Sequence, residues 1–191
     1  MTSKKSINVG IIGFGTVGSG TACILIENAD IIKRRLGIPV KLKKIADLDI
    51  KRDRGIKLGD VQLTNDAKGL ITDPDIDIVV ELIGGYKPAR EFILEAIKNR
   101  KHVVTANKAL LAVHGEEIYA AAQKAGVTVG FEASVAGGIP ILRSLRDGLA
   151  ANQIESIYGI VNGTCNYILT LMTNEGRKFD EVLKEAQAKG Y

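Results

Sequence analysis

The sequence predicts an α/β chain, in which a doubly wound parallel sheet is followed by the start of a second, α+β domain. This prediction depends on short apolar runs that alternate with helical patterns over residues 1–133, and on a glycine-rich turn after the first run. Beyond Glu132 small residues become frequent instead. A chain of 191 residues has room for one domain and part of another, because single cores usually settle near about 100–150 residues. We expect domains over 1–133 and 134–191, the second incomplete.

The first element is a strand over Ile7–Ile12, a nearly continuous apolar run of the kind that is buried on both faces of a parallel sheet. A helix is expected after the glycine turn, because the pattern places these residues on one helical stripe: Val17, Ile24, Leu25, Asn28, Ile31 and Ile32. Strand, glycine turn and helix therefore follow in order.

A second strand is predicted over Val40–Ala46 and ends at Asp47. A short apolar segment at Val61–Leu63 comes next, and a further buried strand covers Ile76–Ile83. Pro88 then opens a helix. The elements that complete the first domain are a strand at Val103–Val104, a helix over Glu116–Ala125 and a strand over Val127–Phe131. Strands that alternate with helices in this way predict a doubly wound parallel sheet.

The second domain begins with a glycine-rich stretch, followed by a helix through Ile141–Leu149 and a strand over Ile154–Val161. Asp180 is expected to cap a final helix that Gly190 stops. Because the chain ends one residue after this helix-stopping glycine, we expect it to be a fragment of a longer protein.

Composition and charge argue against several classes of protein. Hydrophobic residues make up 46% and charged residues 25% of the chain, as in ordinary globular proteins. The net charge of +4 is spread over 26 basic and 22 acidic residues, and aromatic residues are only 5%, so nucleic-acid binding is disfavoured. No apolar stretch approaches the roughly 18 residues of a membrane span. Cys23 and Cys165 lie far apart without metal-ligand spacing, which suits a reducing, cytoplasmic location.

The glycine loop Gly13-Phe14-Gly15-Thr16-Val17-Gly18 matches GxGxxG between a strand and a helix. The first glycine closes the turn, the second lets the backbone approach a pyrophosphate, and the third allows close packing of the helix on the strand. Backbone N–H groups at the helix start then face the phosphates. The alternative is a plain strand-to-helix turn. The context favours a Rossmann-type domain that binds NADP or NAD.

Asp47, at the end of the second strand, is placed to accept hydrogen bonds from the ribose hydroxyls of the cofactor. A carboxylate there favours NAD, yet Lys51, Arg52 and Arg54 follow closely and could hold the 2′-phosphate of NADP. A solvated basic loop is the alternative for this cluster. The choice between NAD and NADP stays open.

Two further features lie after predicted strands, at the sheet edge where ligands bind in open α/β folds. Lys108 could contact the cofactor or polarise a substrate carbonyl. The glycine-rich turn Glu132–Pro140 offers carbonyls and one carboxylate that could surround a hard cation. Cys165 is interpreted as structural, as are His102 and His114.

Five segments, taken in order, resemble homoserine dehydrogenase: Gly13–Gly18, Glu81–Gly85, Thr105–Lys108, Glu132–Pro140 and Asn162–Tyr167. The resemblance covers essentially the whole chain. It implies NAD(P)-dependent interconversion of L-aspartate 4-semialdehyde and L-homoserine, on the route to threonine, methionine and isoleucine. It also implies a small-molecule substrate and a homodimer in the full-length protein. Ala46 departs from the basic residue that many members carry, which leaves NADP preference open.

The same resemblance assigns roles to individual residues. It places Phe14, Thr16 and Val17 against the dinucleotide, Gly85 and Lys108 near the nicotinamide end, and Gly190 against the cofactor. It implies a sodium site built from the Glu132 side chain and the carbonyls of Val135, Gly137 and Ile139. The family's substrate-binding carboxylates and proton-donating lysine would follow Tyr191, so this chain is expected to bind cofactor with little or no turnover. The alternatives are another amino-acid oxidoreductase, such as an aspartate dehydrogenase, and a non-catalytic dinucleotide sensor.

Overall fold

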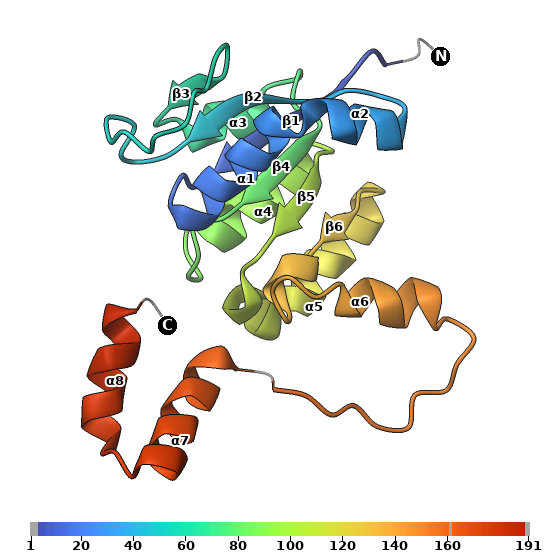
Figure 1. Cartoon of the computed structure of the whole chain (residues 1–191). Coiled ribbons are helices and arrows are strands. Elements are labelled where there is room, and N and C mark those ends of the chain that lie inside the picture. Colours follow the sequence, from blue (N-terminus) through green and yellow to red (C-terminus); the bar gives the residue numbers. More distant parts are fainter. Residues whose placement is uncertain (1–3, 161, 190–191) are drawn as a thin grey trace. The chain divides into compact units, whose positions relative to one another are not determined.

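A computed structural model describes residues 4–160 and 162–189. Its centre is a six-stranded sheet in the order β3-β2-β1-β4-β5-β6, with every neighbouring pair parallel (Figure 1). The strands are β1 (Ile7–Ile12), β2 (Val40–Ala46), β3 (Gln62–Thr64), β4 (Ile78–Glu81), β5 (His102–Thr105) and β6 (Val129–Gly130). This is the order of the doubly wound dinucleotide-binding fold, so the fold class expected from the sequence is confirmed.

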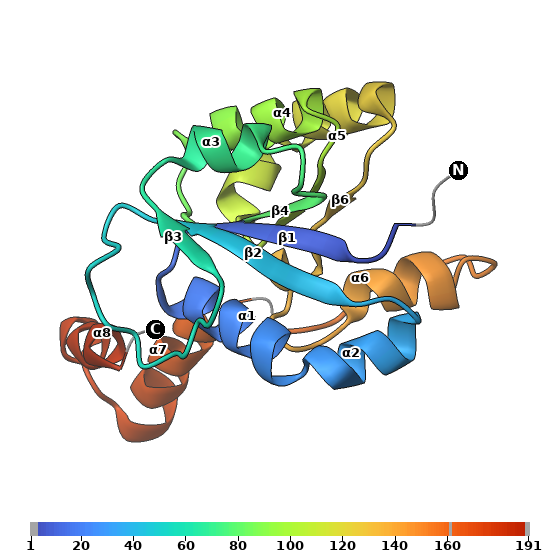
Figure 2. The ribbon, with the colours of Figure 1, turned by 90° about the horizontal axis from the view of Figure 1, so that it is seen from above.

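Helices cover both faces of the sheet, as Figure 2 shows: α3, α4 and α5 lie on one face, and α1 and α2 lie on the other. Their bounds are α1 (Thr16–Glu27), α2 (Ala29–Leu36), α3 (Ala67–Thr72), α4 (Ala89–Lys98) and α5 (Lys108–Ala125). Each face has its own apolar core, one around Ile93 and Ile118 and one around Ile11 and Ile45, all fully buried. Burial on both faces explains the continuous apolar runs of β1 and β4.

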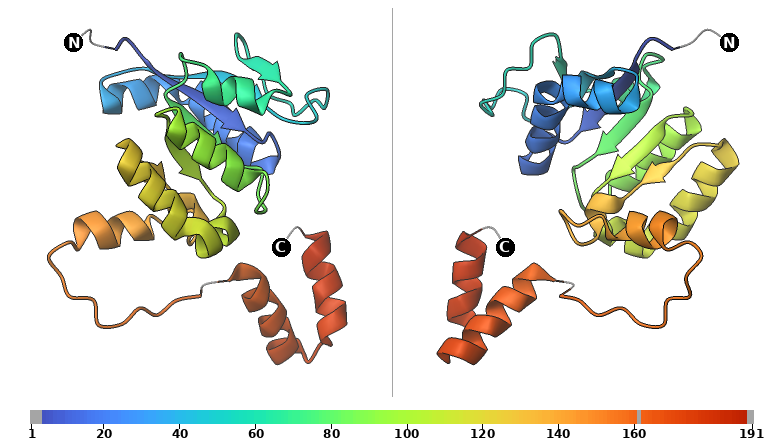
Figure 3. Two further views of the ribbon diagram at one scale, coloured as in Figure 1. Left: turned by 180° about the vertical axis from the view of Figure 1, so that it is seen from behind. Right: turned by 45° about the vertical axis from the view of Figure 1, so that its right-hand side comes forward.

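The chain divides into two compact units, Met1–Arg143 and Ser144–Tyr191. The first unit ends with the short helices η1 (Glu132–Ser134) and α6 (Ile141–Arg143). The second contains the π-helical turn η2 (Ser144–Gly148) and a hairpin of α7 (Gly163–Glu175) and α8 (Phe179–Ala188), shown in Figure 3. The hairpin packs around Ile168, Val182 and Ala186. The domain boundary expected at 133/134 stays a prediction.

The single helix expected after the glycine loop is two helices that meet at Asn28. Within the predicted stripe, the exposed fractions of Val17, Ile24 and Ile31 are 56%, 57% and 42%. The buried residues of α1 are instead Gly18 and Ala22. The predicted stripe is right for Leu25, which packs against the core, and Ile32 is half-buried. It is wrong for Val17, Ile24, Asn28 and Ile31, because the face of α1 nearest the sheet is made by small residues.

The strand expected over Ile154–Val161 is absent from residues 154–160, and Val161 lies outside the described residues. Ile157 and Tyr158 are exposed. A strand needs backbone partners on a neighbouring strand, and no pairing with this segment occurs within 4–160 and 162–189. The final helix begins at Phe179 with Lys178 as its N-cap, so Asp180 lies in the first turn and is not the cap.

Smaller differences concern element ends and two short helices that the pattern did not reveal. The helix expected from Glu116 begins at Lys108, where the Asn107 side chain caps it. The strand expected over Val127–Phe131 is reduced to Val129–Gly130. The helix expected over Ile141–Leu149 is α-helical only over Ile141–Arg143, and the next residues, Ser144–Gly148, form the π-helical turn η2. The helices α3 and α7 were not anticipated from the sequence.

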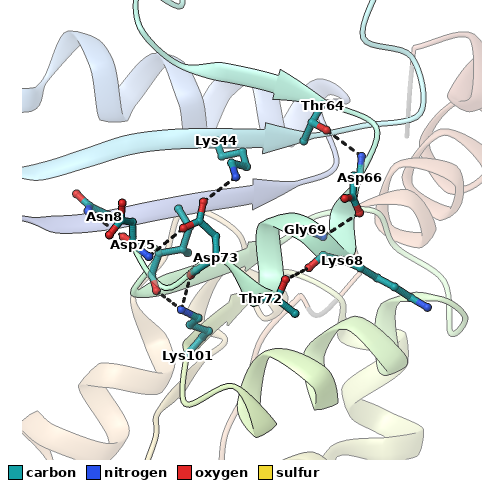
Figure 4. Close-up of polar contacts among 11 residues, drawn as sticks. Asn8, Lys44, Thr64, Asp66, Lys68, Gly69, Thr72, Asp73, Asp75 and Lys101 are labelled. Atoms are coloured by element: carbon teal, nitrogen blue, oxygen red, sulfur yellow. Dashed lines mark hydrogen bonds and ion pairs between the residues drawn. The ribbon is translucent and has the colours of Figure 1, made fainter.

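A polar cluster fastens the turn between α3 and β4 at the edge of the first unit (Figure 4). The Lys101 ammonium is buried and donates to the carbonyls of Asp73 and Ile76, at 2.6 Å each. Burial lowers the pKa of Lys101 below its usual value. Lys44 pairs with Asp73 at 2.7 Å, and this hydrogen bond holds the pKa of the Asp73 carboxyl below its usual range.

In the described part of the chain, no helix has the length and apolar character of a membrane span.

Candidate functional site

A cleft of about 500 Å³ lies at the carboxyl ends of β1, β2 and β4. Its lining includes Gly13 and Gly15 after β1, Asp47 after β2, and Ile83 and Gly84 after β4. Because β1 and β4 are neighbours whose connecting helices lie on opposite faces, the cleft is at the switch point of the sheet. Ligands of open α/β sheets bind in this position.

The three glycines of the loop have different surroundings. Gly13 has a φ of +100°, which favours glycine. At Gly18 a Cβ would lie 2.0 Å from the Gly13 carbonyl oxygen, so only glycine lets the helix pack this closely. At Gly15 a Cβ would meet nothing within 4 Å. This bare backbone, open to the outside, is the surface that a pyrophosphate needs.

The helix α1 begins beside this open backbone without the usual side-chain partners. Its N-cap, Gly15, makes no side-chain capping bond, and the first turn holds no acidic residue. Thr16 and Val17, which form this turn, are both exposed. Uncapped N–H groups and the positive end of the helix dipole favour an anion. The loop therefore has the features of a phosphate-binding site.

Asp47 is tied to the glycine loop by its carboxylate. Its Oδ2 accepts a hydrogen bond from the Phe14 N–H at 2.5 Å. Its Oδ1 accepts from the Asp49 N–H at 2.8 Å and lies 3.3 Å from an Arg54 guanidinium nitrogen. The carboxylate therefore both holds the loop and lines the cleft. Because Arg54 partly neutralises it, it would repel a 2′-phosphate less than an isolated Asp would.

Arg54 is a site residue that the sequence analysis placed only within a basic cluster. Its Nε donates to the Phe14 carbonyl, and its Nη1 donates to the carbonyls of Asp49 and Arg52, at 2.8 and 2.9 Å. Its side chain is 10% exposed, whereas Arg52 is exposed. Most of the N–H groups of Arg54 therefore bind backbone carbonyls of this chain. Arg52, by contrast, is exposed to solvent. Composition could not separate these two arginines, because only the fold turns Arg54 toward Phe14.

Gly85 and Lys108 lie after the neighbouring strands β4 and β5. The carbonyl of Gly85 accepts a hydrogen bond from the Asn107 side chain at 2.6 Å, and Lys108 is the exposed first residue of α5. The structure therefore brings the segments that carry these two residues together through Asn107. Gly190 lies outside the described residues.

The predicted cation turn follows β6. Its carboxylate, from Glu132, accepts hydrogen bonds from the N–H groups of Leu142 and Arg143 at 2.9 and 3.0 Å, at the start of α6. Val135, Gly137 and Ile139 form the turn, in which Ala136 adopts a φ of +47°. Clusters of three or more His, Cys, Asp or Glu residues suited to a metal do not occur in the described residues.

The structural role of Cys165, His102 and His114 stays a prediction. Cys165 is exposed in the first turn of α7, where its N–H donates to the Asn162 side chain at 2.8 Å. The His102 Nδ1 accepts from the Thr128 N–H at 3.1 Å. The His114 ring lies edge-on to Tyr86, with 6.3 Å between centroids.

Comparison with known proteins identifies the family. A family model described as the NAD binding domain of homoserine dehydrogenase matches residues 13–132, and one described as homoserine dehydrogenase matches residues 140–191. The homoserine dehydrogenase of Neisseria gonorrhoeae is 51% identical over 187 residues, which are 98% of this chain and 43% of that protein. This chain therefore spans less than half the length of that relative.

Solved structures agree with this result. A homoserine dehydrogenase from Thiobacillus denitrificans superposes with a TM-score of 0.92 at 53% identity, over 98% of this chain and 43% of that one. A hyperthermophilic archaeal homoserine dehydrogenase in complex with NADPH gives a TM-score of 0.79 at 28% identity, over 97% of this chain and 61% of that one. The chain belongs to the homoserine dehydrogenase family.

Proposed function

We propose that this chain supplies the dinucleotide-binding domain and the start of the catalytic domain of an enzyme that interconverts L-aspartate 4-semialdehyde and L-homoserine. The observation that carries the proposal is the glycine loop, which lines the cleft at the switch point while α1 begins without a capping side chain. Family membership favours this function over an aspartate dehydrogenase or a dinucleotide sensor.

The proposed cofactor is NADP or NAD. The open backbone at Gly15 fits a pyrophosphate, and Asp47 is at the end of β2 where ribose hydroxyls are bound in this fold. Arg52 is exposed nearby and would pair with a 2′-phosphate. The archaeal relative was solved in complex with NADPH, which supports NADP as the cofactor.

When bound, the nicotinamide supplies or accepts the hydride of the reaction. Lys108, exposed at the start of α5, is proposed to stabilise negative charge on the substrate carbonyl oxygen as it develops. The main proton-donating lysine and the substrate-binding carboxylates are proposed to lie in the part of the family's proteins that this chain does not span. We expect the 191 residues alone to bind cofactor with little or no turnover.

A sodium ion is proposed at the turn after β6, held by Glu132 and the carbonyls of Val135, Gly137 and Ile139. Each Glu132 oxygen accepts one backbone N–H, which leaves one lone pair on each oxygen for a cation. Hard oxygen donors of this kind suit such an ion. It would hold the turn rather than take part in hydride transfer.

The whole protein is further proposed to be a cytoplasmic homodimer in threonine, methionine and isoleucine biosynthesis. Its domain boundary is proposed at 133/134, close to the start of the second family match at residue 140.

The dinucleotide site is tested by Gly15→Val. The φ of Gly15 is −71°, which any residue adopts, and its Cβ position is empty, so the variant should fold normally while its side chain covers the phosphate-binding backbone. We expect NADPH binding, followed by nicotinamide fluorescence, to weaken at least about tenfold, since close backbone approach requires glycine there. Gly20→Ala, at an open position within α1, is the control. Unchanged affinity in Gly15→Val would contradict the site.

The reaction is tested by following NADPH oxidation with L-aspartate 4-semialdehyde, first with this chain and then with a protein of the relatives' full length. We expect turnover only in the longer protein. Substantial turnover by the 191-residue chain would show that the acid and the substrate carboxylates are not missing. Oxidation with ammonia and oxaloacetate instead would favour an aspartate dehydrogenase.

A further inference from the structure

Three buried polar side chains lie where β4 and β5 reach the site. Glu81 and Thr105 are fully buried, and Asn107 is 9% exposed. Glu81 and Thr105 are direct neighbours in the register of the two strands, and the Thr105 hydroxyl donates to Glu81 Oε2 at 2.7 Å. A buried carboxylate is costly unless donors surround it, so its position calls for a specific role.

The other oxygen of Glu81 holds the loop that follows β4. Its Oε1 accepts hydrogen bonds from the N–H groups of Ile83 at 2.9 Å and Gly84 at 3.2 Å. Gly84 and Gly85 are both left-handed, with φ of +73° and +69°. The conformation of this loop therefore depends on the Glu81 carboxylate, which accepts from its N–H groups.

Asn107, the residue before α5, connects Thr105 to the loop after β4. Its N–H donates to the Thr105 hydroxyl at 3.0 Å, and its side-chain amide donates to the Gly85 carbonyl at 2.6 Å. Its side-chain oxygen accepts from the Leu110 N–H at 3.2 Å and so caps α5, whose first residue is Lys108. A continuous ring of bonds thus joins the glycine loop after β4 to the residue before Lys108.

In this ring Asn107 donates on both sides, to Thr105 and to Gly85, and Glu81 accepts on both sides. Glu81 receives every one of its three contacts, as a carboxylate must, so the Thr105 hydroxyl donates toward Glu81 and leaves its lone pairs for Asn107. A hydrophobic trio of the same size would pack the strands equally well. It would fix neither the Gly85 carbonyl nor the start of α5.

We propose that Glu81, Thr105 and Asn107 are positioning residues, which set the relative placement of Gly85 and Lys108 at the nicotinamide end of the cofactor. This inference depends on the proposed function, since it concerns the same cleft. It leaves the pyrophosphate with the loop after β1 and the adenosine ribose with the end of β2, and it assigns the placement of the nicotinamide end to this ring.

The test compares two ligands on the 191-residue chain: NADPH, and 2′-phospho-ADP-ribose, which lacks only the nicotinamide. Thr105→Val keeps the shape of the side chain and removes the hydroxyl. Asn107→Asp keeps the oxygen that caps α5 and removes the donor to Gly85. We expect both variants to weaken NADPH binding about tenfold and to bind 2′-phospho-ADP-ribose within about twofold of the parent, because a lost buried hydrogen bond has an effect of this size.

Thr105→Ser restores the hydroxyl and is expected to restore NADPH binding. Thr72→Val is the matched control, since its hydroxyl donates to the Lys68 carbonyl within its own helix, α3. Parallel loss of both ligands, or parental NADPH binding in both variants, would overturn the positioning role. If the parent itself bound neither ligand, the proposed function would fail first and this inference with it.

Discussion

The guanidinium of Arg54 lies over the Phe14 ring, 4.6 Å from its centroid, and donates to the Phe14 carbonyl. The same side chain reaches Asp47, whose carboxylate accepts the Phe14 N–H. Asp47 therefore binds the N–H of Phe14, and Arg54 binds its carbonyl, so both backbone groups of this loop residue are held. This clamp connects the end of β2 to the loop after β1, so the two segments proposed to bind the cofactor are joined directly.

Arg54→Met should weaken NADH and NADPH binding alike. The variant removes the hydrogen bonds that hold Phe14, and a loosened loop must be ordered again when the pyrophosphate binds. We expect a loss of about threefold to tenfold for both cofactors, typical of a hydrogen bond to a charged group. Isothermal titration with each cofactor measures it. A loss confined to NADPH would mean that Arg54 contacts the 2′-phosphate instead.

Arg52→Met should affect NADPH alone. Arg52 is exposed, and its cation is expected to pair with the 2′-phosphate, which NADH lacks. An exposed pair of this kind is typically worth up to about 1 kcal/mol, or roughly fivefold in affinity. The ratio of the two dissociation constants is the readout, with Lys33→Met, at an exposed lysine of α2 outside the basic cluster, as the control. Equal binding of NADPH before and after the change would remove Arg52 from the site.

Gly18→Ala should destabilise the fold itself. The added Cβ would lie 2.0 Å from the Gly13 carbonyl oxygen, which is backbone and cannot turn aside. We expect the free energy of unfolding to fall by about 1–3 kcal/mol, as for overpacking elsewhere. Gly20→Ala, in the same helix with open space around it, should raise stability by up to about 1 kcal/mol. Urea unfolding of both variants gives the comparison.

Lys101→Met should lower stability, because it leaves the carbonyls of Asp73 and Ile76 without the buried ammonium that they accept from. The expected loss is about 1–3 kcal/mol. Lys98→Met is the control, since that side chain is 80% exposed and should change stability by less than about 0.5 kcal/mol. Equal effects of the two variants would show that the buried bonds contribute nothing specific.

Acid should loosen the α7–α8 hairpin. Hydrogen bonds from Lys189, Tyr167 and Arg177 lower the pKa of Glu185 from 4.5 to about 2. A carboxyl whose pKa is lower in the folded chain contributes stability above its unfolded pKa, and this contribution is lost as the pH falls from about 4.5 toward 2. Hydrogen exchange of residues 179–189 across this range measures it. Glu185→Gln should remove this pH dependence, and an unchanged profile in that variant would contradict the assignment.

Much of the first unit could be read from residue patterns. The strands expected at Ile7–Ile12 and Val40–Ala46 became β1 and β2 at the expected bounds. The run in β1 is nearly all apolar, as a strand buried on both faces requires, whereas β2 carries exposed Lys41 and Lys43. Patterns were less informative where small residues pack closely, as in α1, and where a strand needs a partner, as at Ile154–Val161. Both depend on what lies beside the segment.

The sequence by itself was enough to predict the strand, glycine turn and helix around Gly13–Gly18, since the apolar run and the glycine spacing are local features. Tertiary structure alone decided that Arg54, 40 residues from Phe14, clamps the loop, and that Thr105 meets Glu81 across 24 residues. The physical reason is that hydrogen bonds between buried side chains depend on which strands become neighbours. Sheet order, which no local pattern contains, therefore determines which of these polar residues meet.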